Sequence, residues 1–315
     1  MIAAMTNTTF EDIIGQSSTK TTLQLYIDAY SQTGRLPHIS LVGAKGCGKS
    51  AIVRKFREGL RRPDGTRPPI LELNCATIKN KTQFFEHVYP VWTNHNAVLF
   101  GDEIHTLPTD LQSIFLTILE VRKEAVRTVE HEGVAYEFDF NKISFLSATT
   151  DFQKLLAPLQ DRLRQINLEE YNDEQLFEIF EQNLENKIEI KDCAKDAIMQ
   201  TFRGNPRDAV VKADDLKTFA AAKKLNEIKQ QDWISFSQVM GVKPFGLSAS
   251  EIQVVKAIGK KREASLNDIS AITGFDRSLI QRNLEGILVR KGLMSVDGKR
   301  RLTGEGTAFY HKFCK

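Results

Sequence analysis

The residues from Gly43 to Ser50 have the types and spacing of a phosphate-binding loop. They read Gly-Ala-Lys-Gly-Cys-Gly-Lys-Ser and fit the pattern G-x-x-x-x-G-K-[ST]. Glycines suit such a loop because phosphate oxygens must approach backbone N–H groups, and the following helix N-terminus attracts the anion. The pattern predicts that Lys49 reaches the β- and γ-phosphates of ATP and that Ser50 ligates Mg²⁺. The residues expected to contact the nucleotide here are Gly43, Gly46, Cys47, Gly48, Lys49 and Ser50.

Two adjacent acids, Asp102 and Glu103, follow an apolar run, about 55 residues after the glycine loop. An apolar strand that ends in two acids complements a phosphate loop. Asp102 is expected to hold Mg²⁺ through water, and Glu103 to polarise the water that attacks the γ-phosphate. Together with Lys49, this pair predicts an ATPase.

Three further positions could complete the site. Thr149 and Thr150 end another apolar run, where a hydroxyl can report the γ-phosphate or simply cap a strand. Arg162 could stabilise charge in the transition state of a neighbouring subunit, or form a surface salt bridge. Arg207 could approach the phosphates from a lid, or merely follow a helix-start turn.

The surrounding elements must place these residues together. Short apolar runs at 36–42, 70–73, 97–100 and 143–146 alternate with helical patterns at 23–30, 51–60 and 111–119. Strands that alternate with helices predict an α/β fold with a parallel sheet. Alternation across 126–140, centred on Glu132 and Gly133, predicts a β-hairpin.

The rest of the chain changes character. Helical patterns at 174–184, 193–202 and 208–224 predict a small helical lid. Helical patterns at 250–258, 266–273 and 277–288 precede a predicted hairpin at 293–302 that turns at Asp297 and Gly298, which is the winged-helix plan. We therefore expect three domains: 1–169 for nucleotide binding, 170–242 as the lid, and 243–315 as the winged helix.

Charge is distributed unevenly. The whole chain carries a formal net charge of +3, yet residues 243–315 contain 14 Lys and Arg against 7 Asp and Glu. This imbalance favours DNA binding by the C-terminal part, although a solvated basic surface or a protein-docking module remains an alternative. The residues expected to contact DNA are Arg277, Gln281, Arg282, Lys299, Arg300 and Arg301.

No apolar run is long enough to span a bilayer, and residues 1–10 have no signal-peptide pattern. The four cysteines are scattered and form no CxxC pair, so neither a zinc site nor a disulfide framework is indicated. A reducing cytoplasm is the expected location.

The order of these motifs resembles the RuvB family of Holliday-junction branch-migration motors, which belongs to the AAA+ ATPases. The similarity covers about residues 10–309. It rests on Phe10-Glu11-Asp12-Ile13-Ile14-Gly15-Gln16, the glycine loop, Asp102-Glu103-Ile104-His105, Ala148-Thr149-Thr150, Pro158-Leu159-x-Asp161-Arg162 and Arg203-Gly204-x-Pro206-Arg207.

The resemblance implies a hexameric ring that translocates duplex DNA in recombination and repair. It implies that Ile14 lies in the adenine pocket, that Thr149 and Thr150 form sensor 1, that Arg207 is sensor 2 and that Arg162 is the arginine finger. Residues 122–138 occupy the place of the hairpin that docks the partner RuvA, but they are charged here, which leaves open whether such a partner is used. The main alternative is an AAA+ switch, such as a replication initiator or a helicase or clamp loader. A scaffold with a vestigial site is the other alternative.

Overall fold

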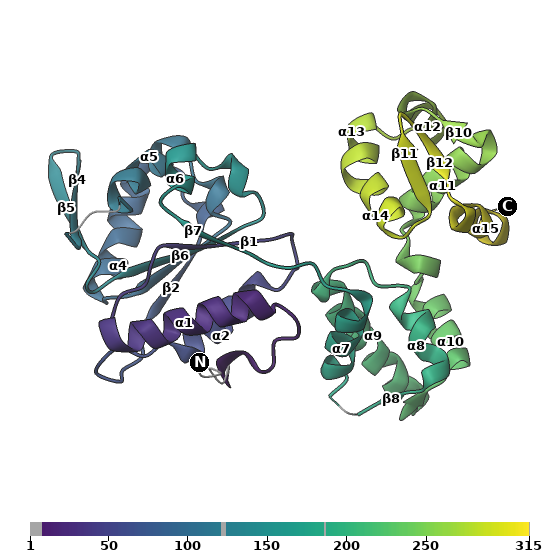
Figure 1. Ribbon diagram of the computed structural model, residues 1–315, viewed down its shortest axis with the longest axis horizontal. Coiled ribbons are helices and arrows are strands. Elements are labelled where there is room, and N and C mark those ends of the chain that lie inside the picture. The colour runs from purple at the N-terminus through teal and green to yellow at the C-terminus, as the bar shows by residue number, and fades with distance from the viewer. Residues whose placement is uncertain (1–7, 121–123, 186, 315) are drawn as a thin grey trace, which may run out of the picture. The chain divides into compact units, whose positions relative to one another are not determined.

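The computed structural model describes residues 8–120, 124–185 and 187–314. They form two compact units, 1–171 and 172–315 (Figure 1). The first unit ends two residues from the boundary expected at 169. The division of the second unit into a lid and a winged helix at 242 stays a prediction.

The first unit is built on a five-stranded parallel sheet with the strand order β2-β3-β6-β1-β7. The strands are β1 (Ile39–Val42), β2 (Ile70–Asn74), β3 (Val98–Asp102), β6 (Ser144–Thr149) and β7 (Arg164–Asn167). Every residue of β6 is buried, as expected of a strand that is covered on both faces. The parallel sheet predicted from the apolar runs is confirmed.

Helices cover both faces of the sheet (Figure 1). On one face, α1 (Ser17–Thr33) and α2 (Lys49–Gly59) share a core with Val98 and Phe100, whereas Leu99 points into the core of the other face. This alternation follows the two-residue period of a strand. The elements of the other face are α3 (Lys81–Gln83), a π-helical turn (Phe84–Val88), α4 (Tyr89–Asn94), α5 (Thr109–Ile118) and α6 (Ala157–Gln160).

The predicted hairpin is present as β4 (Val126–His131) and β5 (Val134–Asp139). Glu132 and Gly133 both have positive φ at its turn, which suits the right-handed twist of the two strands. Tyr136 stacks on Phe85 at 4.2 Å and anchors the hairpin to the helical layer. Arg122 and Lys123, which begin the segment that was compared with a partner-docking hairpin, lie outside the described residues.

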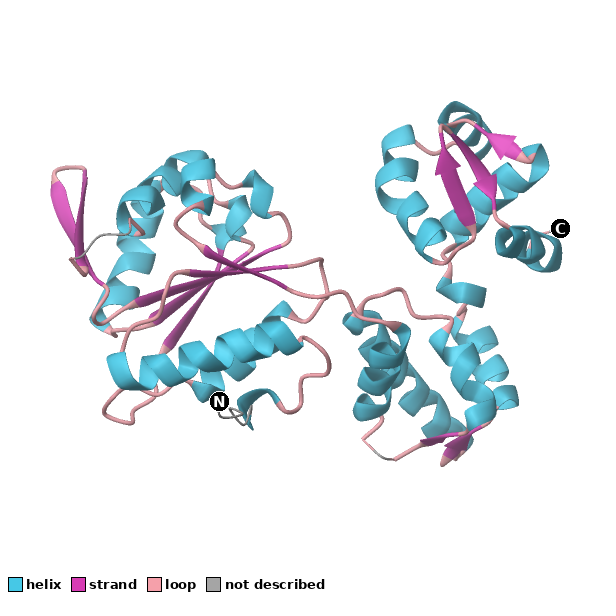
Figure 2. Ribbon diagram, viewed as in Figure 1, coloured by secondary structure: helices cyan, strands magenta, loops and turns pink. Residues whose placement is uncertain are grey.

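The second unit begins with four helices: α7 (Asp173–Asn183), α8 (Asp192–Met199), α9 (Pro206–Lys223) and α10 (Gln230–Met240). The two-residue strands β8 (Glu189–Ile190) and β9 (Glu227–Ile228) pair in parallel. The chain then enters a three-stranded sheet surrounded by helices (Figure 2), which is the predicted winged-helix arrangement.

The helices of this last part are α11 (Ala249–Lys261), α12 (Leu266–Thr273), α13 (Arg277–Leu279), a π-helical turn (Ile280–Leu284), α14 (Glu285–Arg290) and α15 (Gly304–Phe313). The strands are β10 (Glu263–Ala264), β11 (Met294–Asp297) and β12 (Lys299–Leu302). Short 3₁₀ turns elsewhere are Thr8–Phe10, Cys75–Thr77, Ile104–Thr106, Phe152–Lys154 and Pro244–Gly246. Within the described ranges, no helix is both long and apolar enough to cross a membrane.

Candidate nucleotide site

The glycine loop joins the end of β1 to the start of α2, as a phosphate cradle requires. Gly46 and Gly48 have φ of 82° and 96°, which favours residues without a Cβ. A Cβ on Gly43 would lie 2.7 Å from Cys47 Sγ, so the loop is closely folded. Lys49 Nζ donates to the carbonyls of Gly43 at 2.7 Å and Ala44 at 3.1 Å. The ammonium group therefore already lies over the loop whose amides would hold phosphate.

The two acids lie at the same edge of the sheet. Asp102 ends β3, and Glu103 follows in the left-handed region with φ of 51°. Burial, and then the charge of Glu103, raise the pKa of Asp102. A cation bound at this carboxylate would counter both effects.

Packing explains why a glycine occupies position 101, directly before the two acids. A Cβ at this position would lie 3.1 Å from Cys75 Sγ, and Gly101 pairs in register with Leu73 of β2. Strand β3 remains paired with β2 as far as Asp102.

Thr149 and Thr150 differ although they are adjacent. The Thr149 side chain is fully buried, and its Oγ1 accepts the N–H of Asp151 at 3.0 Å. Thr150 is exposed, and its Oγ1 and N–H both donate to Glu103 Oε2, at 3.1 and 3.2 Å. Thr150 therefore presents its hydroxyl at the surface beside Glu103, whereas the Thr149 side chain faces inward.

Two residues near the glycine loop, Gln16 and Tyr171, were not predicted as site residues from the sequence. The Gln16 side chain donates to Glu169 O at 2.7 Å and accepts from Glu169 N at 2.9 Å. This pair of bonds fastens the segment that carries the half-buried Ile14 to the chain after β7. A Cβ at Gly48 would lie 3.4 Å from the Tyr171 hydroxyl, which places Tyr171 beside the loop. The sequence signal for Gln16 was its place in the Gly-Gln segment, but Tyr171 had none.

Arg162 lies at the opposite edge of the sheet. It precedes β7, which pairs in parallel with β1 from Ile39↔Arg164 to Val42↔Asn167. The glycine loop follows the carboxyl end of β1, whereas Arg162 comes before the amino end of β7. These ends are separated by about 10 Å of strand. Arg162 thus lies at the end of the sheet opposite the glycine loop.

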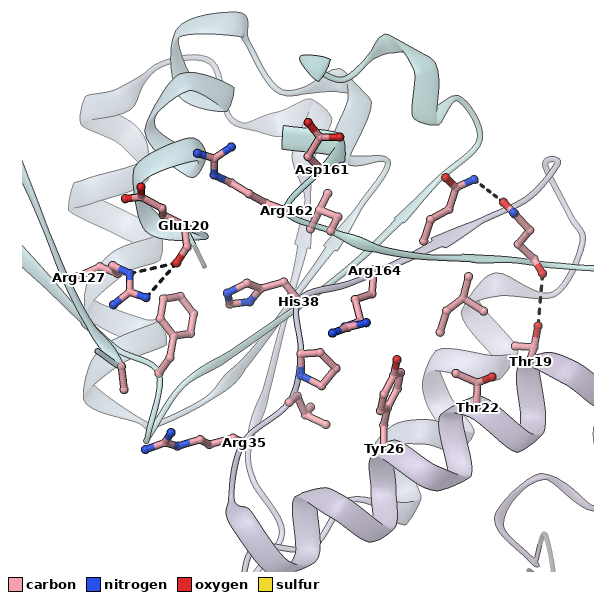
Figure 3. Close-up of a pocket in the computed structure, with 18 of the residues that line it drawn as sticks. Thr19, Thr22, Tyr26, Arg35, His38, Glu120, Arg127, Asp161, Arg162 and Arg164 are labelled. Atoms are coloured by element: carbon pink, nitrogen blue, oxygen red, sulfur yellow. Dashed lines mark hydrogen bonds between the residues drawn. The ribbon is translucent and has the colours of Figure 1, made fainter. Parts of the chain in front are cut away.

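Arg162 lines a cavity of about 910 Å³ (Figure 3). Other arginines in its wall are Arg35, Arg127 and Arg164. The guanidinium of Arg162 donates to Pro158 O at 2.6 Å, and its Nε has no partner within the described residues. The acids Glu120, Glu124 and Asp161 also line the cavity, so both signs of charge meet at the amino edge of the sheet.

Arg207 belongs to the second unit. It follows Pro206 at the start of α9, and its backbone N–H donates to the side chain of Asn205 at 2.9 Å. The Arg207 side chain is exposed.

The predicted DNA contacts fall into two groups. Arg277, Gln281 and Arg282 are exposed, as are Lys299 and Arg301 on β12. Arg300 differs, because it forms an ion pair with Glu285 at 2.7 Å in which each side chain is only 9% exposed. A buried guanidinium with this partner cannot reach a phosphate without breaking the pair, so the prediction that Arg300 contacts DNA is corrected.

A parallel sheet with a phosphate loop after β1, an acid pair at the end of β3 and two threonines at the end of β6 defines a P-loop ATPase of the AAA+ class. Residues 5–168 match the family model described as the Holliday junction DNA helicase RuvB P-loop domain. The chain therefore belongs to this family, and it is an ATP-driven DNA motor.

The chain is similar to named RuvB proteins along nearly its whole length. A subunit named Holliday junction branch migration complex subunit RuvB, from Campylobacter hominis, is 27% identical over 94% of this chain and 86% of its own. A protein of the same name from Mycoplasma pneumoniae is 24% identical over 93% of both chains. The solved structure of the Thermotoga maritima RuvB branch migration motor shares the fold, with a TM-score of 0.71 over 95% of both chains at 23% identity.

Proposed function

We propose that this protein uses ATP hydrolysis to promote branch migration or translocation on duplex or branched DNA, as a homo-oligomeric ring that is most simply a hexamer. The observation that carries the proposal is the placement of the catalytic groups at opposite edges of one sheet. Glu103 lies at the carboxyl edge with the glycine loop, and Arg162 lies at the amino edge. A complete active site then takes Glu103 from one subunit and Arg162 from the next.

Within one site, the residues have separate tasks. Lys49 exchanges its bonds with the loop carbonyls for the β- and γ-phosphates of ATP, and Ile14 packs against the adenine. Glu103 orients and polarises the attacking water, and Thr150 contacts the γ-phosphate. Arg162 of the neighbouring subunit stabilises the charge that develops on the transferred phosphoryl group, and Arg207 approaches the phosphates from the lid.

The oxygens of Ser50 and Asp102 suit Mg²⁺, which prefers carboxylate, hydroxyl and water ligands. The raised pKa of Asp102 fits this assignment, because a divalent cation would favour its ionised form. When bound, Mg²⁺ would neutralise charge on the phosphates. Ser50 and Asp102 supply the ligands that would orient it.

DNA is proposed to lie against the winged helix. Arg277, Gln281 and Arg282 share one exposed helical segment, and Lys299 and Arg301 project from β12. Cations of this kind suit phosphates and leave the motor free to change register. A junction-binding partner would dock on the exposed tip of the β4–β5 hairpin, where Glu130, Glu132 and Val134 are accessible.

The test is ATP turnover by the full chain, measured with no DNA, duplex DNA, single-stranded DNA and a synthetic four-way junction. We expect duplex and four-way DNA to raise steady turnover, and the four-way substrate to be converted to two duplexes. Stable ATP-dependent DNA binding without stimulated turnover would contradict a motor and favour a switch.

A further inference from the structure

His105 is placed between two residues of the nucleotide site. It lies on the 3₁₀ turn Ile104–Thr106, two residues after Glu103, and its side chain is 13% exposed. Its Nδ1 atom is 2.7 Å from Thr149 Oγ1 and 3.3 Å from Glu103 Oε2. The ring thus joins the end of β6 to the acid that follows β3.

The partners determine the state of Nδ1. The Glu103 carboxylate can only accept hydrogen bonds, so a close contact with an unprotonated ring nitrogen would set two acceptors against each other. Thr149 Oγ1 accepts the Asp151 N–H at 3.0 Å and has a second lone pair for His105. These contacts assign a hydrogen to Nδ1, shared between Thr149 and Glu103.

We propose that His105 is a positioning residue for ATP hydrolysis, which ties the Glu103 carboxylate to the end of β6 through Thr149. The inference rests on the proposed role of Glu103 in polarising water. Glu103 Oε2 receives three contacts, two from Thr150 and one from His105. When the Thr150 hydroxyl turns towards a γ-phosphate, its bond to Glu103 is lost, and His105 remains to hold the carboxylate.

The consequence is specific to the hydrolytic step. His105 bonds to Thr149 and Glu103, whereas Lys49 bonds to the carbonyls of Gly43 and Ala44, so we expect His105 to contribute little to nucleotide affinity. A carboxylate that loses its orientation by about 1 Å can slow a reaction by about 10²-fold. Loss of the tie should therefore lower kcat and leave ATP binding almost unchanged.

The experiment uses the full chain and the variants His105→Ala, His105→Asn and Thr149→Val, with His87→Ala as the control. His87 is an exposed histidine whose Nε2 atom lies 4.0 Å from a carboxylate oxygen of the neighbouring Glu86. Turnover, the KM for ATP, the Kd of a non-hydrolysable ATP analogue and Tm are measured for each. We expect His105→Ala to lower kcat by about 10- to 100-fold, with the Kd within threefold of wild type.

His105→Asn should recover most of the lost rate, because the asparagine amide can donate from nearly the same place as Nδ1. Thr149→Val should slow turnover as His105→Ala does, since it removes the anchor. Adding His105→Ala to Glu103→Gln should produce no further loss, because two residues that act as one unit are not additive.

The inference is overturned if His105→Ala retains kcat within twofold, if His105→Asn is as slow as His105→Ala, or if nucleotide affinity falls as much as kcat. Should His105→Ala fail to fold, His105→Asn and Thr149→Val carry the test: slow turnover by Thr149→Val at unchanged Kd supports the tie, and unchanged turnover defeats it. Absence of hydrolysis by the wild-type protein would instead defeat the proposed function.

Discussion

Arg203 holds the carboxylate of Glu251 with both terminal nitrogens, at 2.8 and 2.6 Å. Glu251 is only 1% exposed, and it also accepts the N–H of Ser248 at 2.7 Å in the capping box that begins α11. Arg203 donates in addition to Gly246 O at 2.7 Å. The Arg203 guanidinium therefore links the start of α11 to the chain segment that precedes the Arg207 turn.

Arg203→Ala is expected to destabilise the second unit. It would leave Glu251 buried and without its charged partner, a change that costs about 3–5 kcal/mol when an ion pair is fully buried and less here, because Arg203 is 31% exposed. Thermal unfolding of the full chain should show the loss, with Arg203→Lys intermediate because lysine keeps the charge but not the two-pronged geometry. An unchanged Tm in Arg203→Ala would show that the pair contributes little.

The same pair has a pH signature. Burial alone would raise the pKa of Glu251, but the bonds from Arg203 and Ser248 hold it below the usual range. A carboxyl whose pKa is lower in the folded state stabilises the fold above its unfolded pKa, and this stabilisation is lost as the pH falls. The difference in unfolding free energy between wild type and Arg203→Ala should therefore shrink as the pH falls below about 4.

Glu103→Gln should bind ATP and fail to hydrolyse it. The amide keeps the size of the side chain and loses the ability to polarise water, so turnover should fall by about 10²- to 10⁴-fold. Lys49→Ala should instead lose nucleotide binding, which a fluorescent ATP analogue would report. Turnover of Glu103→Gln at the wild-type rate would assign the catalytic base elsewhere.

Mixing Glu103→Gln with Arg162→Ala protein tests whether the active site is shared. Each variant alone should be inactive, whereas a mixture forms some interfaces in which an intact Glu103 faces an intact Arg162. At equal proportions, about a quarter of the interfaces should be intact if subunits assemble at random. Co-assembled mixtures without activity would argue against a shared site.

Lys299→Ala combined with Arg301→Ala should make DNA affinity less sensitive to salt. Each phosphate contact contributes about 0.9 to the slope of log K against log salt, so the slope should flatten by up to about 2. Both cations contact Glu263, at 2.5 Å each, so the observed change will be somewhat smaller. Lys223→Ala, an exposed cation on α9, is the matched control. An identical slope in the double variant would place the DNA on another surface.

The lowered pKa of His38 predicts that the free energy of unfolding falls on mild acidification. Burial, and then the charge of Arg127, lower its pKa to about 4. Between the ordinary histidine pKa of about 6.5 and a pH of about 4, the unfolded chain takes up a proton that the folded chain refuses, so the free energy of unfolding falls as the pH falls. His38→Gln should remove this component, and urea unfolding at pH 7.5 and 5 would measure it. Equal pH sensitivity in both proteins would show that His38 does not titrate in this way.

The sequence predicted the elements that carry the chemistry, because strands buried on both faces form unmistakable apolar runs. It missed β7, whose sequence Arg-Gln-Ile-Asn offers a single apolar residue at the edge of the sheet. It also missed residues 81–94, where a π-helical turn interrupts the helical period. The orientation of Arg300 could have been predicted from the sequence, because alternation along a strand places its side chain on the opposite face from those of Lys299 and Arg301. The contact between His105 and Glu103 could not have been predicted, because it depends on the positive φ of Glu103 in the turn after β3.

The parallel pairing of β1 with β7 also has a consequence for when ATP is hydrolysed. On the proposed arrangement, a lone chain holds nucleotide at one edge and carries, at the other edge, a cation that only a neighbour can use. Hydrolysis per chain would then rise with protein concentration, and dilution would silence it without any inhibitor. Newly made or unassembled chains would be inactive, and ATP would be hydrolysed only where enough copies have assembled on DNA.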